Sequence, residues 1–188
     1  MNGALEQEKY YTYEEWLAID DGNRYELLNG ELYMMASPSS RHQEVSFEIG
    51  RQIGTFLVGK HYRIYTAPYD VRLHKDEDTV LQPDIVVVCD RSKISKKGCD
   101  GAPDLVVEVL SPSTTRRDRL TKFSEYLRAG VQEYWVVDPV DKTVCAYRLI
   151  DKKYYAEMYS ETMSAPVQTL AGCEVDLSLV FRDYDEEQ

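Results

Sequence analysis

The densest apolar stretches of the chain lie near its middle, at residues 85–89 (IVVVC) and 105–110 (LVVEVL). Both are near-continuous aliphatic runs rich in β-branched residues, a pattern typical of strands that are covered on both faces. A third run, Glu133–Asp138 (EYWVVD), predicts another strand, which Pro139 closes. We therefore predict a mixed central sheet in which the first two runs are adjacent inner strands.

Two segments, 41–58 and 115–129, have apolar residues at helical spacing. The positions that form the two stripes are Val45, Ile49 and Ile53 in the first segment, and Leu120, Phe123 and Leu127 in the second. Each stripe predicts a helix with one face on a core. Strands bracketed by two such helices predict an α/β fold built as a three-layer sandwich.

Smaller elements are predicted towards both ends. Thr12 and Glu15 have the spacing of a capping box, which predicts a short helix. Asn29-Gly30 separates two apolar runs and predicts a β-hairpin, because both turn positions favour a positive φ. The remaining strand predictions are a strand pair or bent strand over 62–73 and a strand pair over 142–159.

The length of 188 residues fits one domain. We expect its core at about 40–140, an N-terminal helix and hairpin within 1–36, and C-terminal strands and a tail over 141–188. Hydrophobic residues make up 43% and charged residues 29%, which is ordinary for a globular protein.

The formal net charge of −11 argues against a protein that coats DNA regardless of sequence, which needs a basic surface. It leaves room for a nucleic-acid enzyme with a local basic patch or with metal ions between carboxylates and phosphates. The chain has no apolar run long enough for a membrane helix and no signal-peptide pattern at its start. Its four cysteines are scattered without zinc spacing, so we expect reduced thiols in a cytoplasmic protein.

Glu108 is the most informative single residue, because it stands inside a run that otherwise reads as a buried strand. An unpaired buried carboxylate is costly, so it must bind a metal, pair with a cation or line a cleft floor. A structural salt bridge or a locally exposed strand face is the alternative. Perturbed carboxylates gather at functional sites, which favours the functional interpretation.

Asp84 opens the neighbouring strand after Pro83. Alone, this dipeptide indicates only a turn. With Glu108 on the adjacent strand, two carboxylates come within shared reach of one divalent cation. Ligation by oxygen alone suits Mg²⁺ or Mn²⁺ rather than Zn²⁺. We therefore predict a metal site at Asp84 and Glu108.

Lys122 has two interpretations. By helical angle it lies opposite the apolar stripe of its segment, which predicts solvated surface. By length, however, a helix that returns antiparallel to the strand brings Lys122 level with Glu108. The sequence leaves both open.

Other candidates carry weaker signals. His42 lies on the apolar side of its helix near the start, where a histidine is more often structural than a ligand. The chain's dense basic cluster is Arg116, Arg117 and Arg119. Cations are disfavoured at a helix N-terminus, so this cluster indicates a nearby anion such as phosphate, although a charged first turn is the simpler interpretation.

Several segments together resemble the Uma family, whose bacterial members are described as endonucleases of the PD-(D/E)xK, restriction endonuclease-like superfamily. The resemblance runs from about Thr12 to about Phe181. The segments that carry it are Tyr25–Glu31, Ser37–His42, Gln82–Val88, Ala102–Thr114, Arg117–Lys122 and Gly130–Pro139.

The resemblance implies an αβββαβ nuclease core and metal-dependent hydrolysis of phosphodiester bonds. We expect DNA to be the substrate. Asp84 matches the aspartate of the motif and Glu108 its acidic position. Leu110 stands where the motif has lysine, and Lys122 on the following helix is the displaced counterpart. Glu31 and His42 match recurrent family positions near the cleft and are secondary candidates.

Three functions remain open from the sequence: a metal-dependent endonuclease, a catalytically inactive nuclease-fold module that binds nucleic acid or protein, and an unrelated metal-dependent hydrolase. Leu110 and the net charge favour the module. The two carboxylates favour the enzyme. We also expect a homodimer, with the hairpin Tyr25–Met35 or the tyrosine-rich strands after residue 142 as the interface.

Overall fold

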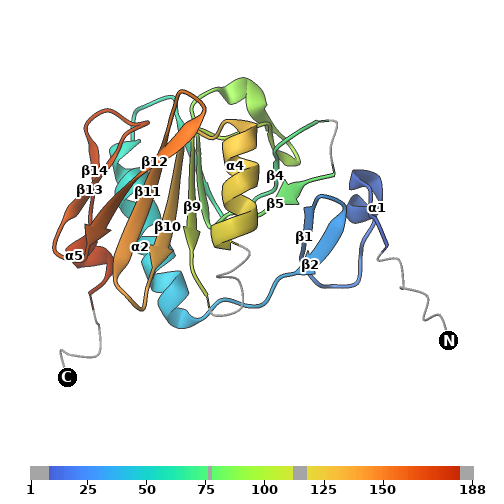
Figure 1. Cartoon of the computed structure of the whole chain (residues 1–188), viewed down its shortest axis with the longest axis horizontal. Coiled ribbons are helices and arrows are strands. Elements are labelled where there is room, and N and C mark those ends of the chain that lie inside the picture. The colour runs from blue at the N-terminus through green and yellow to red at the C-terminus, as the bar shows by residue number, and fades with distance from the viewer. Residues whose placement is uncertain (1–8, 76–77, 112–117, 183–188) are drawn as a thin grey trace.

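The computed structural model describes residues 9–75, 78–111 and 118–182 (Figure 1). Its centre is a six-stranded sheet, in which β9 and β10 run parallel and the other neighbours antiparallel. The sheet is therefore mixed, as predicted. Its strands, in spatial order, are β12 (Lys153–Ser160), β11 (Thr143–Ile150), β10 (Glu133–Asp138), β9 (Leu105–Val109), β6 (Ile85–Val88) and β3 (Arg63–Thr66).

The two apolar runs at the centre of the sequence form neighbouring inner strands, which confirms the main sequence prediction. Every residue of β6 and of β9 is buried. Their antiparallel register pairs Ile85 with Val107 and Val87 with Leu105. Because both faces of these strands are covered, any polar side chain at this point of the sheet must find a partner within the protein.

Helices cover the central sheet on both faces, so the three-layer α/β architecture is confirmed. In Figure 1, α2 (Ser40–Phe56) and α4 (Phe123–Ala129) lie on opposite sides of β9 and β10. The first helix begins after Ser39, whose side chain accepts from the backbone N–H of His42. Its buried apolar face, predicted from sequence, packs into one of the two cores. The predicted bounds 41–58 are displaced by one or two residues.

The second helix departs from the prediction at its start. Residues 115–117 lie outside the described residues, and η2 (Asp118–Lys122) is a π-helical turn that leads into α4. A π turn holds more residues than an α turn, so it rotates the side chains that precede α4 away from α-helical phase. Leu120 is consequently 62% exposed and Lys122 only 2%. The prediction that Leu120 belongs to the apolar stripe was wrong, and so was the surface interpretation of Lys122.

A second six-stranded sheet lies beside the first and was not foreseen, because four of its strands have only two or three residues. The segment predicted at 62–73 is divided between the two sheets, with β3 in the central one. The strands of the second sheet, in order, are β2 (Glu31–Met34), β1 (Tyr25–Leu28), β5 (Val80–Leu81), β4 (Val71–Arg72), β8 (Gly98–Asp100) and β7 (Ile94–Ser95).

The predicted hairpin and its preceding helix are both present. Strands β1 and β2 pair across Asn29-Gly30, whose φ angles are 52° and 81°. The helix α1 (Tyr13–Leu17) carries the reciprocal capping box of Thr12 and Glu15. The hairpin strand β1 then pairs with β5, which brings the N-terminal part of the chain against the residues that precede β6.

The C-terminal strand pair is confirmed as β11 and β12, whose register is continuous over all eight residues of each strand. The remaining elements are η1 (Arg91–Lys93), β13 (Ser164–Val167), β14 (Cys173–Asp176) and α5 (Leu177–Val180). All four cysteines are free thiols. Within the part of the chain that the structure describes, none of the helices has the length and apolar character needed to cross a membrane.

Candidate active site

Asp84 and Glu108 face each other across two central strands. The register that pairs Ile85 with Val107 places the preceding residue, Asp84, opposite Glu108 when it is continued by one step. Directly opposed residues of an antiparallel pair project from the same face, with Cβ atoms about 5 Å apart. The backbone N–H of Val109 donates to Asp84 Oδ2 at 2.7 Å, which holds this carboxylate at the end of β9.

Lys122 reaches Glu108 from the helical layer. Its Nζ lies 2.8 Å from Glu108 Oε1, and both side chains are at least 95% buried. The length argument from the sequence therefore holds, although the helical-angle argument failed. The π turn is what directs this side chain inwards.

Tyr126, one turn further along the helical layer, donates its hydroxyl to the same Oε1 atom at 2.7 Å. Burial, followed by the nearby Glu108 carboxylate, raises the pKa of Tyr126 well above its ordinary value. The phenol is therefore a neutral hydrogen-bond donor. Glu108 is thus compensated by a cation and a hydroxyl on one oxygen, which explains how a carboxylate is tolerated in a buried strand.

Glu26 belongs to this cluster and was missed by the sequence analysis. It lies in β1, is fully buried, and its Oε1 is 2.9 Å from Lys122 Nζ. The same oxygen accepts from the backbone N–H of Gln82 at 3.0 Å, two residues before Asp84. The signal was present in the sequence, since Glu26 interrupts the apolar hairpin strand 25–28 just as Glu108 interrupts 105–110.

His42 also reaches the cluster, as the sequence suggested only weakly. It lies in the first turn of α2, and its Nε2 is 3.2 Å from Asp84 Oδ2. The side chain is 11% exposed. Asp84 therefore accepts a hydrogen bond from the backbone N–H of Val109 in β9 and contacts the imidazole of His42 in α2, which belongs to the opposite helical layer.

One sequence candidate is not brought into the cluster, and the side chains of the three arginine candidates fall outside what the structure describes. Glu31 is exposed at the start of β2, where its carboxylate accepts from the hydroxyl of Tyr33. Arg116 and Arg117 lie outside the described residues, as does the side chain of Arg119. The arginine that the structure does place at the site is Arg24, which lines its cavity.

The cluster opens into a cavity of about 520 Å³. The wall is formed by the hairpin, the start of α2, the ends of β6 and β9, and the helical layer. The polar residues that matter for its chemistry are Arg24, Ser39, His42, Asp84, Glu108 and Lys122. Five of the six carry ionisable side chains, and they come from segments spread over the chain.

The carboxylate pair has the chemistry of a hard-cation site. The described residues contain no group of three or more His, Cys, Asp or Glu side chains that could enclose a metal ion. Mg²⁺, however, is commonly held by only one or two carboxylates, with water and substrate phosphates completing its shell. Asp84 and Glu108 fit that mode, because they share one face of the sheet at the edge of the cavity.

Comparison with known proteins identifies relatives over nearly the whole chain. The Uma2 family, described as "Putative restriction endonuclease", matches residues 8–178. Two proteins of Synechocystis sp. (strain ATCC 27184 / PCC 6803 / Kazusa) are similar in sequence. "Uncharacterized protein sll1609" is 26% identical over 136 residues, covering 69% of this chain and 76% of the relative. "Uncharacterized protein slr1290" is 28% identical over 148 residues, covering 78% and 75%.

One solved structure supports the fold. It is the crystal structure of a protein from Anabaena variabilis ATCC 29413, described as "a putative nuclease belonging to DUF820". It superposes with a TM-score of 0.74 at 22% identity, covering 90% of this chain and 97% of that protein. The two proteins therefore share the same fold over nearly their whole lengths.

Proposed function

The chain belongs to the Uma2 family, and from this membership and the cavity we propose that it is a metal-dependent endonuclease that hydrolyses phosphodiester bonds of DNA. The observation that carries the proposal is the convergence of Asp84, Glu108 and Lys122 on one cavity. The two carboxylates lie on adjacent strands and the lysine on the helical layer that covers them.

In this proposal Asp84 and Glu108 hold Mg²⁺ or Mn²⁺. When bound, such an ion activates water and stabilises negative charge on a scissile phosphate. The protein fixes Asp84 through the Val109 N–H and His42, and fixes Glu108 through Lys122 and Tyr126. Carboxylates held in this way need little reorganisation when a cation arrives, which favours binding.

Lys122 contributes a buried positive charge beside the carboxylates. Its ammonium can orient water or stabilise the charge that develops on a phosphate in the transition state. The absence of a lysine at position 110 does not argue against activity, since Leu110 is buried and Lys122 supplies the cation from the helix. Lys122, in η2, thus provides Glu108 with the positive charge that the lysine of the (D/E)xK motif would provide from the strand.

Phosphate recognition falls to the basic residues around the cavity. Arg24 lines the cavity itself. Arg116, Arg117 and Arg119 are proposed to bind phosphates flanking the scissile bond, because they lie three to six residues before Lys122 in the sequence. With a net charge of −11, affinity for DNA then depends on these few arginines and on the metal, and falls as salt rises. A cytoplasmic location accords with such a substrate.

The alternative is a nuclease-fold module without catalytic activity. One observation favours it: Lys122 and Tyr126 both contact Glu108 Oε1, so the charge of this oxygen is compensated by the protein itself. The two functions differ in whether divalent cations bind at all, and in whether binding leads to cleavage.

Titration calorimetry with Mn²⁺, combined with nicking of supercoiled plasmid, tests the proposal. Asp84→Asn and Glu108→Gln should abolish metal binding, because each removes a charged oxygen ligand. Lys122→Ala should retain metal binding and slow cleavage by about 10²-fold or more. Glu31→Gln is the matched control, since it removes an exposed carboxylate outside the cluster.

If the two carboxamide variants bind Mn²⁺ like wild type, the site is wrong. If they lose the metal and wild type cuts no nucleic acid, the module is the better description.

A further inference from the structure

The strand at one edge of the central sheet, β12, is regular along its whole length. Within the described residues, β12 pairs with β11 alone, and this pairing is unbroken over eight residues. The strand contains no proline, no glycine and no bulge. Proteins normally protect an open edge with features such as proline or a bulge, because a regular edge strand readily pairs with another chain.

The side chains of this edge are apolar as well as accessible. Tyr155 is 55% exposed and Met158 63%. Ile150, at the end of β11, is 41% exposed and is opposite Lys153, so it lies on the same face of the sheet as Tyr155. Exposed apolar area on both faces of one edge strand is typical of an interaction surface.

The charges along β12 indicate which partner fits. Lys153 stands at the beginning of the strand and Glu157 four residues later on the same face, and both are exposed. A copy of this strand placed antiparallel brings the lysine end of each strand to the glutamate end of the other. A parallel copy would instead align lysine with lysine. The edge is therefore complementary to itself in the antiparallel orientation.

We infer that β12 pairs antiparallel with β12 of a second copy of this chain, with Tyr155 at the two-fold axis. This axis is perpendicular to the sheet, so it keeps each face of the sheet on its own side. Residues of one face then oppose only residues of that face. With Tyr155 on the axis, Lys153 lies opposite Glu157 of the second copy, and the symmetry makes this pair twice.

Neighbouring registers lack this match. An axis at Ala156 opposes Lys153 to Tyr159, and an axis at Glu157 opposes the two Glu157 side chains to each other. Like charges directly opposite in a sheet are destabilising. Glu161 is already paired with Lys142 at 3.3 Å, so it does not offer Lys153 an equivalent partner.

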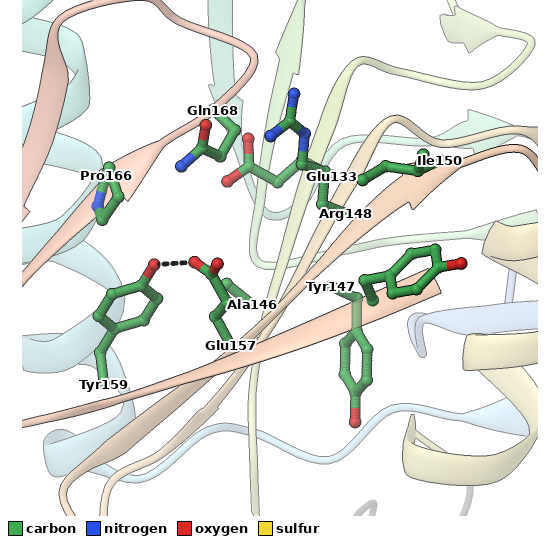
Figure 2. A pocket seen from close by; sticks show the side chains of 10 residues that line it. Glu133, Ala146, Tyr147, Arg148, Ile150, Glu157, Tyr159, Pro166 and Gln168 are labelled. Atoms are coloured by element: carbon green, nitrogen blue, oxygen red, sulfur yellow. Dashed lines mark hydrogen bonds between the residues drawn. The ribbon is translucent and has the colours of Figure 1, made fainter. Parts of the chain in front are cut away.

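The proposed contact involves a small cavity on the same face of the sheet. Figure 2 shows Glu157 and Tyr159 joined by a hydrogen bond on one side of this cavity, with Arg148 and Gln168 on the other. Its volume is about 80 Å³, and Tyr155 also lines it. The second copy's Tyr155 would extend this wall across the axis. The cavity is too small for a nucleotide, which is consistent with a role in packing between copies.

This interface is independent of the proposed nuclease site. Three strand spacings separate β12 from β9, which carries Glu108. The antiparallel pairing forms a continuous twelve-stranded sheet from two sheets of six, in which the large cavity of each copy lies beside inner strands β6 and β9, away from the β12–β12 contact. The inference would stand if the protein proved to have no nuclease activity.

Sedimentation velocity on the full chain tests the charge match. Wild type should be a dimer at about 10 µM. Lys153→Glu should raise the dissociation constant of the dimer at least about tenfold, because it sets glutamate against glutamate twice. The double variant Lys153→Glu/Glu157→Lys should restore the dimer, since the pairs are re-formed with their signs exchanged. Lys97→Glu, at an exposed lysine in the turn between β7 and β8, is the control for the change in net charge.

Disulfide trapping tests the register. Directly opposed residues have Cα atoms about 4.5–5.5 Å apart, within the range that a disulfide spans. Tyr155→Cys should therefore form a covalent dimer under mild oxidation. Met158→Cys also lies at an exposed position of β12, but its two copies would be roughly 20 Å apart along the strands. Wild type controls for the four native cysteines.

Three results would overturn the inference. The first is a wild type that remains monomeric at about 100 µM, well above the micromolar range. The second is a dimer whose dissociation constant is unchanged in Lys153→Glu, or is not restored in the double variant. The third is trapping of Tyr155→Cys that is no faster than trapping of Met158→Cys. Any of these would place the contact, if one exists, elsewhere on the molecule.

Discussion

Lys122 Nζ lies 2.9 Å from Glu26 Oε1, and the two side chains are 97% and 99% removed from solvent. The pair joins the first strand of the chain to the helical layer behind the carboxylates of the cavity. A buried ion pair is not in itself a large source of stability, because both charges lose their hydration. Its effect here is positional, since Glu26 and Glu108 hold one ammonium group between them.

Removing the charge of Glu26 should weaken the fold while leaving Glu108 in place. Glu26→Gln removes the charge of one of the two carboxylates seen to contact Lys122, but the amide oxygen can still accept from the backbone N–H of Gln82. We expect a loss of about 1–3 kcal/mol in the free energy of unfolding. Urea denaturation at pH 7 measures it, with Glu31→Gln as the exposed control, expected within about 0.5 kcal/mol of wild type. Equal values for the two variants would contradict the role given to Glu26.

Removing the positive charge of Lys122 should lower the free energy of unfolding by more than removing the charge of Glu26. Lys122→Met keeps most of the side-chain volume but leaves Glu26 and Glu108 buried without their shared ammonium. Breaking such a pair from one side costs about 3–5 kcal/mol. If Glu108 binds a divalent cation, Mn²⁺ should raise the melting temperature of this variant more than that of wild type. Thermal unfolding with Mn²⁺ and with EDTA makes the comparison, and equal shifts would argue against a metal at Glu108.

The parts of the site that lie on the central strands could be predicted from the sequence. Strands β6 and β9 are long aliphatic runs, so their adjacency follows from the need to cover both faces. That adjacency brings Asp84 to Glu108. The adjacency of the two strands and the approach of Asp84 to Glu108 both follow from apolar runs of several residues, where the hydrophobic effect decides the local structure.

The parts that failed depend on single-residue details of the backbone. The π turn at Asp118–Lys122 holds one more residue than an α turn, so Leu120 is exposed and Lys122 is buried. The spacing of apolar residues in the sequence gives no sign of this turn. The short strands β4 and β5 have too few residues for an alternation to be recognised. Glu26 is different: its position within an apolar strand was visible, and applying the argument used for Glu108 would have found it. The division of the chain into core and additions stays a prediction.

The exchange of Leu120 and Lys122 can be tested through stability. Leu120 is 62% exposed, so Leu120→Gln should change the free energy of unfolding by less than about 0.5 kcal/mol. Phe123 packs edge-on against Tyr147 and Tyr154, with ring centroids 5.0 and 5.3 Å away. Phe123→Ala should therefore cost about 2 kcal/mol or more. Chemical denaturation of both variants decides the matter. A cost for Leu120→Gln comparable with that of Phe123→Ala would return Leu120 to the core and remove the π turn.

Tyr126 gives the cluster a pH dependence on the alkaline side. Its hydroxyl donates to Glu108 Oε1 at 2.7 Å, so Tyr126→Phe should lose about 1.5–3 kcal/mol at pH 7, the range for a hydrogen bond to a charged group. Burial, and then Glu108, raises the pKa of Tyr126 in the folded protein, whereas the unfolded chain ionises near the ordinary value of about 10.

The stability due to this raised pKa is complete below about pH 10 and is lost above it, because the unfolded chain releases a proton that the folded protein retains. Tyr126→Phe has no such proton. The free energy of unfolding of wild type should thus fall more steeply than that of the variant above this pH, by up to about 1.4 kcal/mol per pH unit. Urea denaturation of both proteins at pH 7, 9 and 10.5 measures the difference. It should be constant between the first two values and smaller at the third, and a difference that stays constant throughout would show that Tyr126 is not held as a buried neutral donor.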